Sequence, residues 1–135
     1  MPDIRQELRQ YYQWLRQHGY NDSHSGNISA RDGNTVWITP TGACADTLKA
    51  EDFIACTLNT ENNTYELGAS ASGDGNLHCS VYLANPEAKA MIHSHCPHAV
   101  ALTLNGKNFT PPDFEGQLYF GEVPVHFVNL NIKKQ

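Results

Sequence analysis

The sequence predicts an α+β fold built around a sheet that is mostly antiparallel. Apolar residues recur at helical spacing between Ile4 and Leu15, whereas several later segments are rich in β-branched and aromatic residues. Short turns such as Asp32-Gly33-Asn34 separate most of these segments, and such turns join antiparallel neighbours. At 135 residues the chain is long enough to bury a sizeable core, so we expect one domain over residues 1–135.

Local signals place the individual elements. Asp3 can cap a first helix that runs to about Gln17, with Gly19 as its stop. Two further helices are expected at about 76–84 and at about 98–104. The expected strands are Ile28–Arg31, Thr35–Thr39, Phe53–Leu58, Thr64–Leu67, Ala90–His95 and Val123–Leu130. Among them, Ala90–His95 is expected to be the central strand.

Composition and charge argue against several classes of partner. The formal net charge is −5 and the nine Lys and Arg residues form no cluster, so we expect neither a nucleic acid nor an anionic membrane as partner. No apolar run approaches the ~18 residues of a membrane span, and the N-terminus lacks the apolar stretch of a signal peptide. We therefore expect a cytoplasmic protein with four reduced cysteines.

Two histidines, His93 and His95, are the strongest candidates for metal binding. They lie two residues apart on a predicted strand, so their side chains project from the same face. Neighbouring imidazoles suit Zn²⁺ or another divalent metal, whose bonds to nitrogen measure about 2.0–2.1 Å. A pair of structural histidines gives the same spacing, so the neighbouring motifs have to decide between the two interpretations.

Three loops rich in small polar residues precede this pair. Glycine lets backbone N–H groups approach a ligand closely, and hydroxyl groups donate further hydrogen bonds, so such loops suit a phosphate. Each loop alone is also an ordinary turn, but three of them in one small domain make a phosphate site an equal alternative. The loops are Ser25-Gly26-Asn27, Thr39-Pro40-Thr41-Gly42 and Ser70-Ala71-Ser72-Gly73.

Asp74 directly follows the third loop. A carboxylate beside a metal can exchange a proton with a substrate hydroxyl, and the alternative is that Asp74 caps the helix that follows. His78 is interpreted as a helix-face residue, His98 as a structural group and His126 as a half-buried sheet residue. A catalytic pair of Cys96 and a histidine is the weakest alternative, because no orienting group accompanies it.

Together these motifs resemble the class II aldolase/adducin family. The resemblance covers nearly all of the chain, and it implies a three-layer α/β/α architecture in which helices flank the central sheet. The matching segments, in chain order, are Ser25–Arg31, Ile38–Gly42, Ser72–Tyr82, Asn85-Pro86 with His93-Ser94-His95, and Pro111-Pro112 with Gly121–Val125.

The resemblance implies a role for each matching residue. His93 and His95 would bind Zn²⁺, and Asp74 falls where the aldolases carry a catalytic Glu. The metal would act as a Lewis acid on a ketose carbonyl while the carboxylate moves the proton. A homo-oligomer, often a tetramer in the family, is also implied. The phosphate of a small phosphorylated sugar would be held by Asn27, Thr41, Gly42, Ser72 and Gly73.

Two departures from the family pattern accompany the resemblance. Asp74 is one methylene shorter than Glu, and the ribulose-phosphate 4-epimerases of the family carry Asp there. Family enzymes take a third metal-binding His from a downstream strand, usually followed by Gly, and no His-Gly pair follows His95. We expect a chain that lacks the family's C-terminal segment. The third protein ligand is not identified, and within the chain only His126 or Asp74 is available for that place.

The leading hypothesis is therefore a metal-dependent aldolase that cleaves a small phosphorylated ketose such as fuculose 1-phosphate. An epimerase or dehydratase acting on a similar sugar phosphate is the first alternative. A non-catalytic, adducin-like domain without the third metal ligand is the second.

Overall fold

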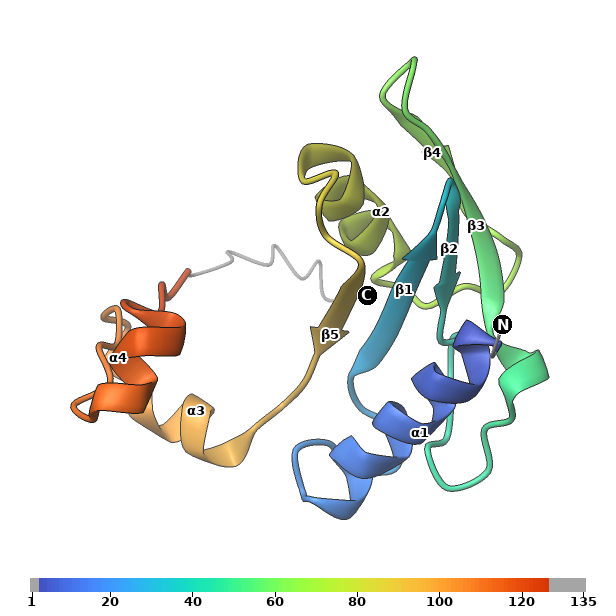
Figure 1. Cartoon of the computed structure of the whole chain (residues 1–135). Coiled ribbons are helices and arrows are strands. Elements are labelled where there is room, and N and C mark those ends of the chain that lie inside the picture. The colour runs from blue at the N-terminus through green and yellow to red at the C-terminus, as the bar shows by residue number, and fades with distance from the viewer. Residues whose placement is uncertain (1–2, 127–135) are drawn as a thin grey trace, which may run out of the picture. The chain divides into compact units, whose positions relative to one another are not determined.

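The computed structural model describes residues 3–126, and its contacts divide the chain into two compact units, Met1–His95 and Cys96–Gln135 (Figure 1). We describe each unit by itself, and the expectation of one domain over residues 1–135 stays a prediction. The first unit contains α1 (Ile4–Gln17), η1 (Ala50–Asp52), α2 (Gly75–Ala84) and a sheet. No helix among the described residues has the length and the apolar character needed to cross a bilayer.

The sheet of the first unit is antiparallel throughout and has the strand order β4-β3-β2-β1-β5. Gly33, with φ +58°, turns the chain between β1 and β2, so that Asp32 pairs with Thr35. All five strands were expected from the sequence, with small shifts at their ends. They are β1 (Asn27–Asp32), β2 (Thr35–Ile38), β3 (Ile54–Asn59), β4 (Thr64–Glu66) and β5 (Ala90–His93).

Helices cover both faces of this sheet (Figure 1). The side chain of Asp3 caps α1 by accepting from the backbone of Arg5, and the helix buries Leu8 and Tyr12 on one face of the sheet. On the opposite face, Cys79 and Tyr82 of α2 pack against Val36, Ile38, Cys56 and Leu58. The α+β prediction with three α/β/α layers is therefore confirmed.

One expectation about the sheet is wrong. β5 is not central, because within the described residues it lies at the edge of the sheet and pairs with β1 alone. It also ends at His93 instead of His95. The order of strands in a sheet depends on pairings between distant segments, which a local pattern of apolar and polar residues does not specify.

The second unit contains α3 (Pro97–Leu102) and α4 (Phe114–Phe120) in its described part. α4 was missed, although Asp113 caps it by accepting from the backbone N–H of Gly116. Of the strand expected at Val123–Leu130, the described part forms only an isolated bridge between Phe109 and Val123. Residues 127–130 lie outside the described residues.

Gly26 brings the loop before β1 into direct contact with the end of β5. Its φ is +71°, and a Cβ at this position would lie 2.5 Å from the carbonyl oxygen of His93 and would overlap the side-chain amide of Asn21. Gly33 shares the positive φ but has open space around it. At Gly26 the backbone conformation and the available space both exclude a side chain, whereas at Gly33 only the backbone conformation does so.

We expect Gly26→Ala to lower the free energy of unfolding by about 3 kcal/mol or more, because it adds a steric clash to backbone strain. Gly33→Ala is the matched control and should cost about 1 kcal/mol, since it adds the strain alone. Urea unfolding followed by tryptophan fluorescence measures both, because Trp14 and Trp37 lie in the first unit. Equal losses in the two variants would show that the contact with His93 is unimportant.

Candidate active site

A polar hollow of about 200 Å³ lies in the first unit, where β1 begins and β5 ends. The loop before β1, the loop after β2 and the turn before α2 form its other walls. All eight residues that the sequence analysis selected line it, together with five that it did not select. The selected residues are Asn27, Thr41, Gly42, Ser72, Gly73, Asp74, His93 and His95, and the others are Tyr12, His24, Gly26, Pro40 and Ala43.

Two of the three small-residue loops are joined by backbone hydrogen bonds. The N–H of Thr41 donates to the carbonyl of Ser70 at 2.8 Å, and the N–H of Ser72 donates to the carbonyl of Thr39 at 3.0 Å. This pairing places Gly42 and Gly73 in the same wall of the hollow. The wall presents hydroxyl groups and backbone with little side-chain bulk, which suits a phosphate.

The rings of His93 and His95 stack, with their centroids 4.9 Å apart and their planes inclined by 22°. β5 ends at His93, but the backbone of His95 is held in place by the loop between α1 and β1. Its N–H donates to the carbonyl of Tyr20 at 3.0 Å and to Oδ1 of Asn21 at 2.9 Å. The two imidazoles therefore stay side by side, as the two-residue spacing predicted.

Asp74 occupies the N-cap position of α2, but its side chain makes no capping hydrogen bond. Instead, its Oδ2 accepts from Nδ2 of Asn27 and from Nδ1 of His93, both at 2.7 Å. The hydrogen bond from Asn27 contributes most, and that from His93 next, to a pKa of Asp74 below its usual value. The carboxylate is therefore ionised at neutral pH and faces the hollow.

The ionised carboxylate determines which nitrogen of His93 carries a proton. Asp74 has no proton to donate, so the hydrogen bond at Nδ1 requires an N–H there. In the neutral ring Nε2 then keeps its lone pair, which is the arrangement of a histidine that binds a metal through Nε2. Because Asp74 lies on the Nδ1 side, it orients His93 in this geometry and does not complete a ligand set with its Nε2.

A buried series of hydrogen bonds continues from Asn27 into the core between the sheet and α2. Oδ1 of Asn27 lies 2.5 Å from Nε2 of His78, and Nδ1 of His78 lies 2.7 Å from Oγ of Ser29. Oγ of Ser29 in turn lies 2.8 Å from the hydroxyl of Tyr82. This series was not predicted from the sequence, although Asp74, His78 and Tyr82 are spaced by four and so share one helix face.

The donor set only partly matches a catalytic zinc site. His93 and His95 supply two neighbouring imidazoles, whereas catalytic zinc usually takes three protein ligands. Among residues 3–126 no group of three or more His, Cys, Asp or Glu side chains is placed to hold a metal ion. The described residues therefore fit two positions of such a site and leave the third unassigned.

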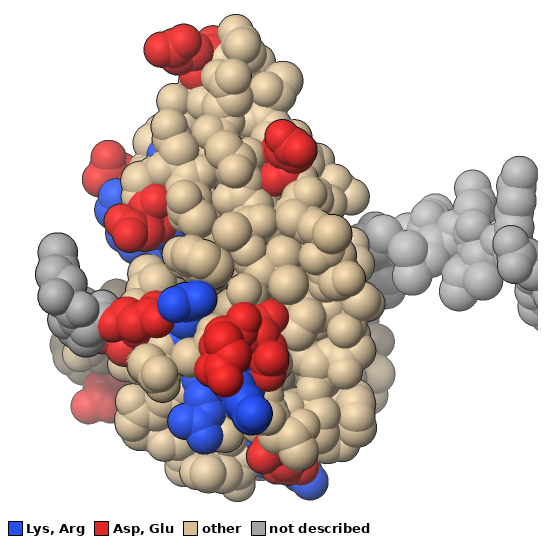
Figure 2. Space-filling model, turned by 90° about the vertical axis from the view of Figure 1, so that its right-hand side faces the viewer, with Lys and Arg blue, Asp and Glu red and all other residues tan. Residues whose placement is uncertain are grey.

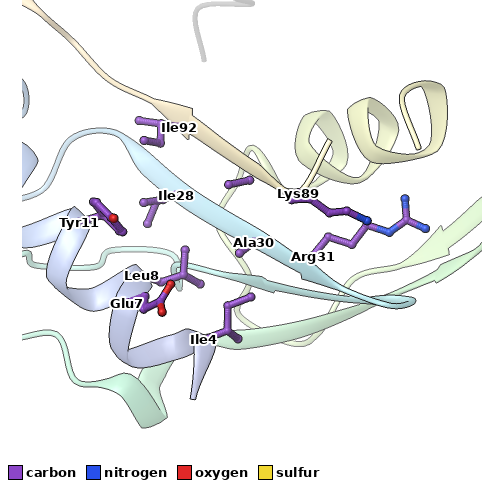
Figure 3. A pocket seen from close by; sticks show the side chains of 10 residues that line it. Ile4, Glu7, Leu8, Tyr11, Ile28, Ala30, Arg31, Lys89 and Ile92 are labelled. Carbon is purple, nitrogen blue, oxygen red and sulfur yellow. The ribbon is translucent and has the colours of Figure 1, made fainter. Parts of the chain in front are cut away.

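A larger hollow of about 420 Å³ lies on the face of the sheet that α1 covers, between α1 and the strands β1 and β5 (Figure 3). Its walls are mainly apolar, with Leu8, Ile28 and Ile92 turned toward it (Figure 3).

On the face shown in Figure 2, basic side chains lie among acidic ones and form no continuous basic patch. We take the smaller hollow as the candidate active site because it contains the polar donors and the paired imidazoles.

Comparisons with known proteins show what the chain is similar to. The family model described as "Class II Aldolase and Adducin N-terminal domain" matches residues 6–132. A 3-oxo-tetronate 4-phosphate decarboxylase of Cupriavidus necator is 38% identical over 76% of this chain. A methylthioribulose-1-phosphate dehydratase of Granulibacter bethesdensis is 33% identical over 71% of it. The crystal structure of l-fuculose-1-phosphate aldolase from Thermus thermophilus superposes with a TM-score of 0.78 and 30% identity, covering 91% of this chain.

This chain covers only part of each of these proteins. It spans 46% of the decarboxylase, 45% of the dehydratase and 62% of the aldolase chain. The first unit, with both imidazoles and all three small-residue loops, lies within the residues that the family model matches, apart from its first five.

The buried imidazole of His78 makes stability depend on pH. Burial lowers the pKa of His78 to about 4, against its ordinary value of 6.5, and the charge of Asp74 offsets only part of this effect. Between these values the unfolded chain binds a proton that the folded chain does not. The free energy of unfolding should therefore fall as the pH drops from 6.5 toward 4, by about 3 kcal/mol at most.

Urea unfolding at about pH 7.5 and at about pH 4.5 measures this loss. His78→Gln cannot be protonated, so its stability should change less between the two pH values than that of the wild type. The same pH dependence in both proteins would show that another group is responsible.

Proposed function

Because the chain belongs to the class II aldolase and adducin family, we propose that it is a metal-dependent lyase acting on a small phosphorylated ketose such as fuculose 1-phosphate. The observation that supports this most is the polar hollow, which joins paired imidazoles, an ionised carboxylate and two loops suited to a phosphate. A homo-oligomer, as is common in the family, belongs to the same proposal.

In this proposal the phosphate lies against the wall formed by Thr41, Gly42, Ser72 and Gly73. No Lys or Arg is among the described residues that line the hollow. Hydroxyl and backbone N–H dipoles would therefore supply the positive potential for the phosphate, as they do in other glycine-rich anion sites. Asn27 also lines the hollow, and its amide nitrogen already donates to Asp74.

The metal would be held by His93 through Nε2 and by His95. When bound, it supplies a Lewis acid that polarises the ketone of the substrate. Asp74 would take the proton of the C4 hydroxyl as the C3–C4 bond breaks, which releases an aldehyde. The electron pair of that bond stays on the fragment that carries the ketone, and return of a proton to C3 completes the second product.

Decarboxylation is the second candidate, and the Cupriavidus necator relative favours it. In a 3-oxo acid, loss of carbon dioxide also leaves an electron pair on the carbon next to the ketone. The same polarised ketone and the same phosphate wall would serve both reactions. Dehydration is a further alternative because the Granulibacter bethesdensis relative is a dehydratase. 4-Epimerisation is another, because the 4-epimerases of the family carry Asp at the position of Asp74.

We expect purified wild-type protein to contain about one zinc ion per chain, measured by elemental analysis after dialysis against a metal-free buffer. His93→Ala should abolish the zinc content, because it removes one of the two imidazoles. His18→Ala, at the exposed end of α1, is the matched control and should keep it. A wild-type protein that stays free of zinc after loading would contradict the metal-dependent reactions.

We expect zinc-loaded protein to release an aldehyde and dihydroxyacetone phosphate from fuculose 1-phosphate, measured by product analysis with wild type and Asp74→Asn. Asp74→Asn should lose at least about 100-fold in kcat, because an amide cannot carry the proton. With 3-oxo-tetronate 4-phosphate, carbon dioxide instead of an aldehyde would identify the second candidate. Equal rates in Asp74→Asn and wild type would contradict the role of the carboxylate.

A further inference from the structure

Asn27 links the hollow to the interior, because its carboxamide bonds on both sides. Nδ2 faces the carboxylate of Asp74 at 2.7 Å, and Oδ1 faces Nε2 of His78 at 2.5 Å. Asn27 is 7% exposed and His78 is fully buried, so on the His78 side water does not substitute for a lost partner.

The charge of Asp74 determines the direction of every hydrogen bond in this series. If the carboxamide were reversed, its oxygen would face an ionised carboxylate at hydrogen-bond distance, with no proton between them. With Nδ2 toward Asp74, the carboxamide oxygen faces His78 and needs a donor there. Nε2 of His78 therefore carries the proton, and Nδ1 accepts from the hydroxyl of Ser29.

The opposite end of the series holds the ring of His78 in place. Ser29 lies on β1 and Tyr82 on α2, and both side chains are fully buried. The hydroxyl of Tyr82 contacts both the hydroxyl and the carbonyl oxygen of Ser29, at 2.8 and 3.1 Å. The ring of His78 is thus held to β1 through Ser29, which Tyr82 of α2 also contacts, and its Nε2 is directed at Asn27.

We propose that His78 is a positioning residue of the site: its Nε2–H fixes the carboxamide of Asn27, which directs Asp74 and thereby His93. His78 does not line the hollow and so acts only through Asn27. The consequence for metal binding rests on the proposed function. The orientation of Asn27 and the tautomer of His93 do not, because they follow from hydrogen bonds within the chain.

Nitrogen-15 NMR of the histidine rings in the full chain tests the first step without any variant. At about pH 7 the wild type should show His78 as a neutral ring with its proton on Nε2, and His93 with its proton on Nδ1. A proton on Nδ1 of His78, or a charged His78 ring, would overturn the proposal.

Two variants test the step from His78 to the site. The side-chain nitrogen of Gln can occupy the place of the imidazole Nε2, so His78→Gln keeps a donor for Asn27, whereas His78→Leu removes it. We expect the Nδ1–H tautomer of His93 to persist in His78→Gln and to be partly lost in His78→Leu. Zinc affinity, measured by competition with a chelator, should fall about tenfold in His78→Leu and recover in His78→Gln.

Ser29→Ala keeps the test decisive if His78→Leu does not fold. It keeps the imidazole but removes the hydroxyl that holds Nδ1, so we expect the ring of His78 to lose its fixed orientation and the Nδ1–H tautomer of His93 to be partly lost. An unchanged His93 in both Ser29→Ala and a folded His78→Leu would overturn the proposal. If no variant or wild type binds zinc while the tautomers behave as expected, the proposed function fails and the role of His78 stands.

Discussion

The carboxylate of Asp74 joins three segments that are far apart in the sequence. Through one oxygen it receives hydrogen bonds from the first residue of β1 and the last residue of β5, while its backbone begins α2. Loss of these bonds would remove the side chain that joins the start of β1, the end of β5 and the start of α2. Both donors stabilise the charged form of the carboxylate, so its pKa stays low although it lies between packed elements.

A single negative charge also orders the polar interior. An ionised carboxylate only accepts, and this requirement passes through Asn27 and His78 to Ser29. Each group in the series donates to the next one toward Asn27, so every buried polar side chain of the series has a partner. This explains how a histidine and two hydroxyl groups are accommodated between α2 and the sheet, where burial would otherwise cost stability.

Much of the fold could be predicted because local chemistry determines it. Asp3 caps α1, Gly33 turns β1 into β2, and a two-residue spacing places His93 and His95 side by side. The series through His78 was not predicted, because a histidine on a helix face has no local sign that its partner is an asparagine 51 residues earlier. The edge position of β5 was missed for the same reason, since strand order depends on pairing between distant segments. The site residues that the family resemblance implied line one hollow in the structure. Their chemical roles stay predictions.

The position of β5 has a consequence for how the hollow is maintained. Within the described part of the chain this strand hydrogen-bonds to one neighbour only, so little backbone energy opposes its local separation from β1. Such an opening would carry both imidazoles away from the carboxylate in one movement. Both rings move with β5, so the hydrogen bond from Nδ1 of His93 to Asp74 opposes the opening, and loss of this bond should lower the amide protection along Ala90–His93.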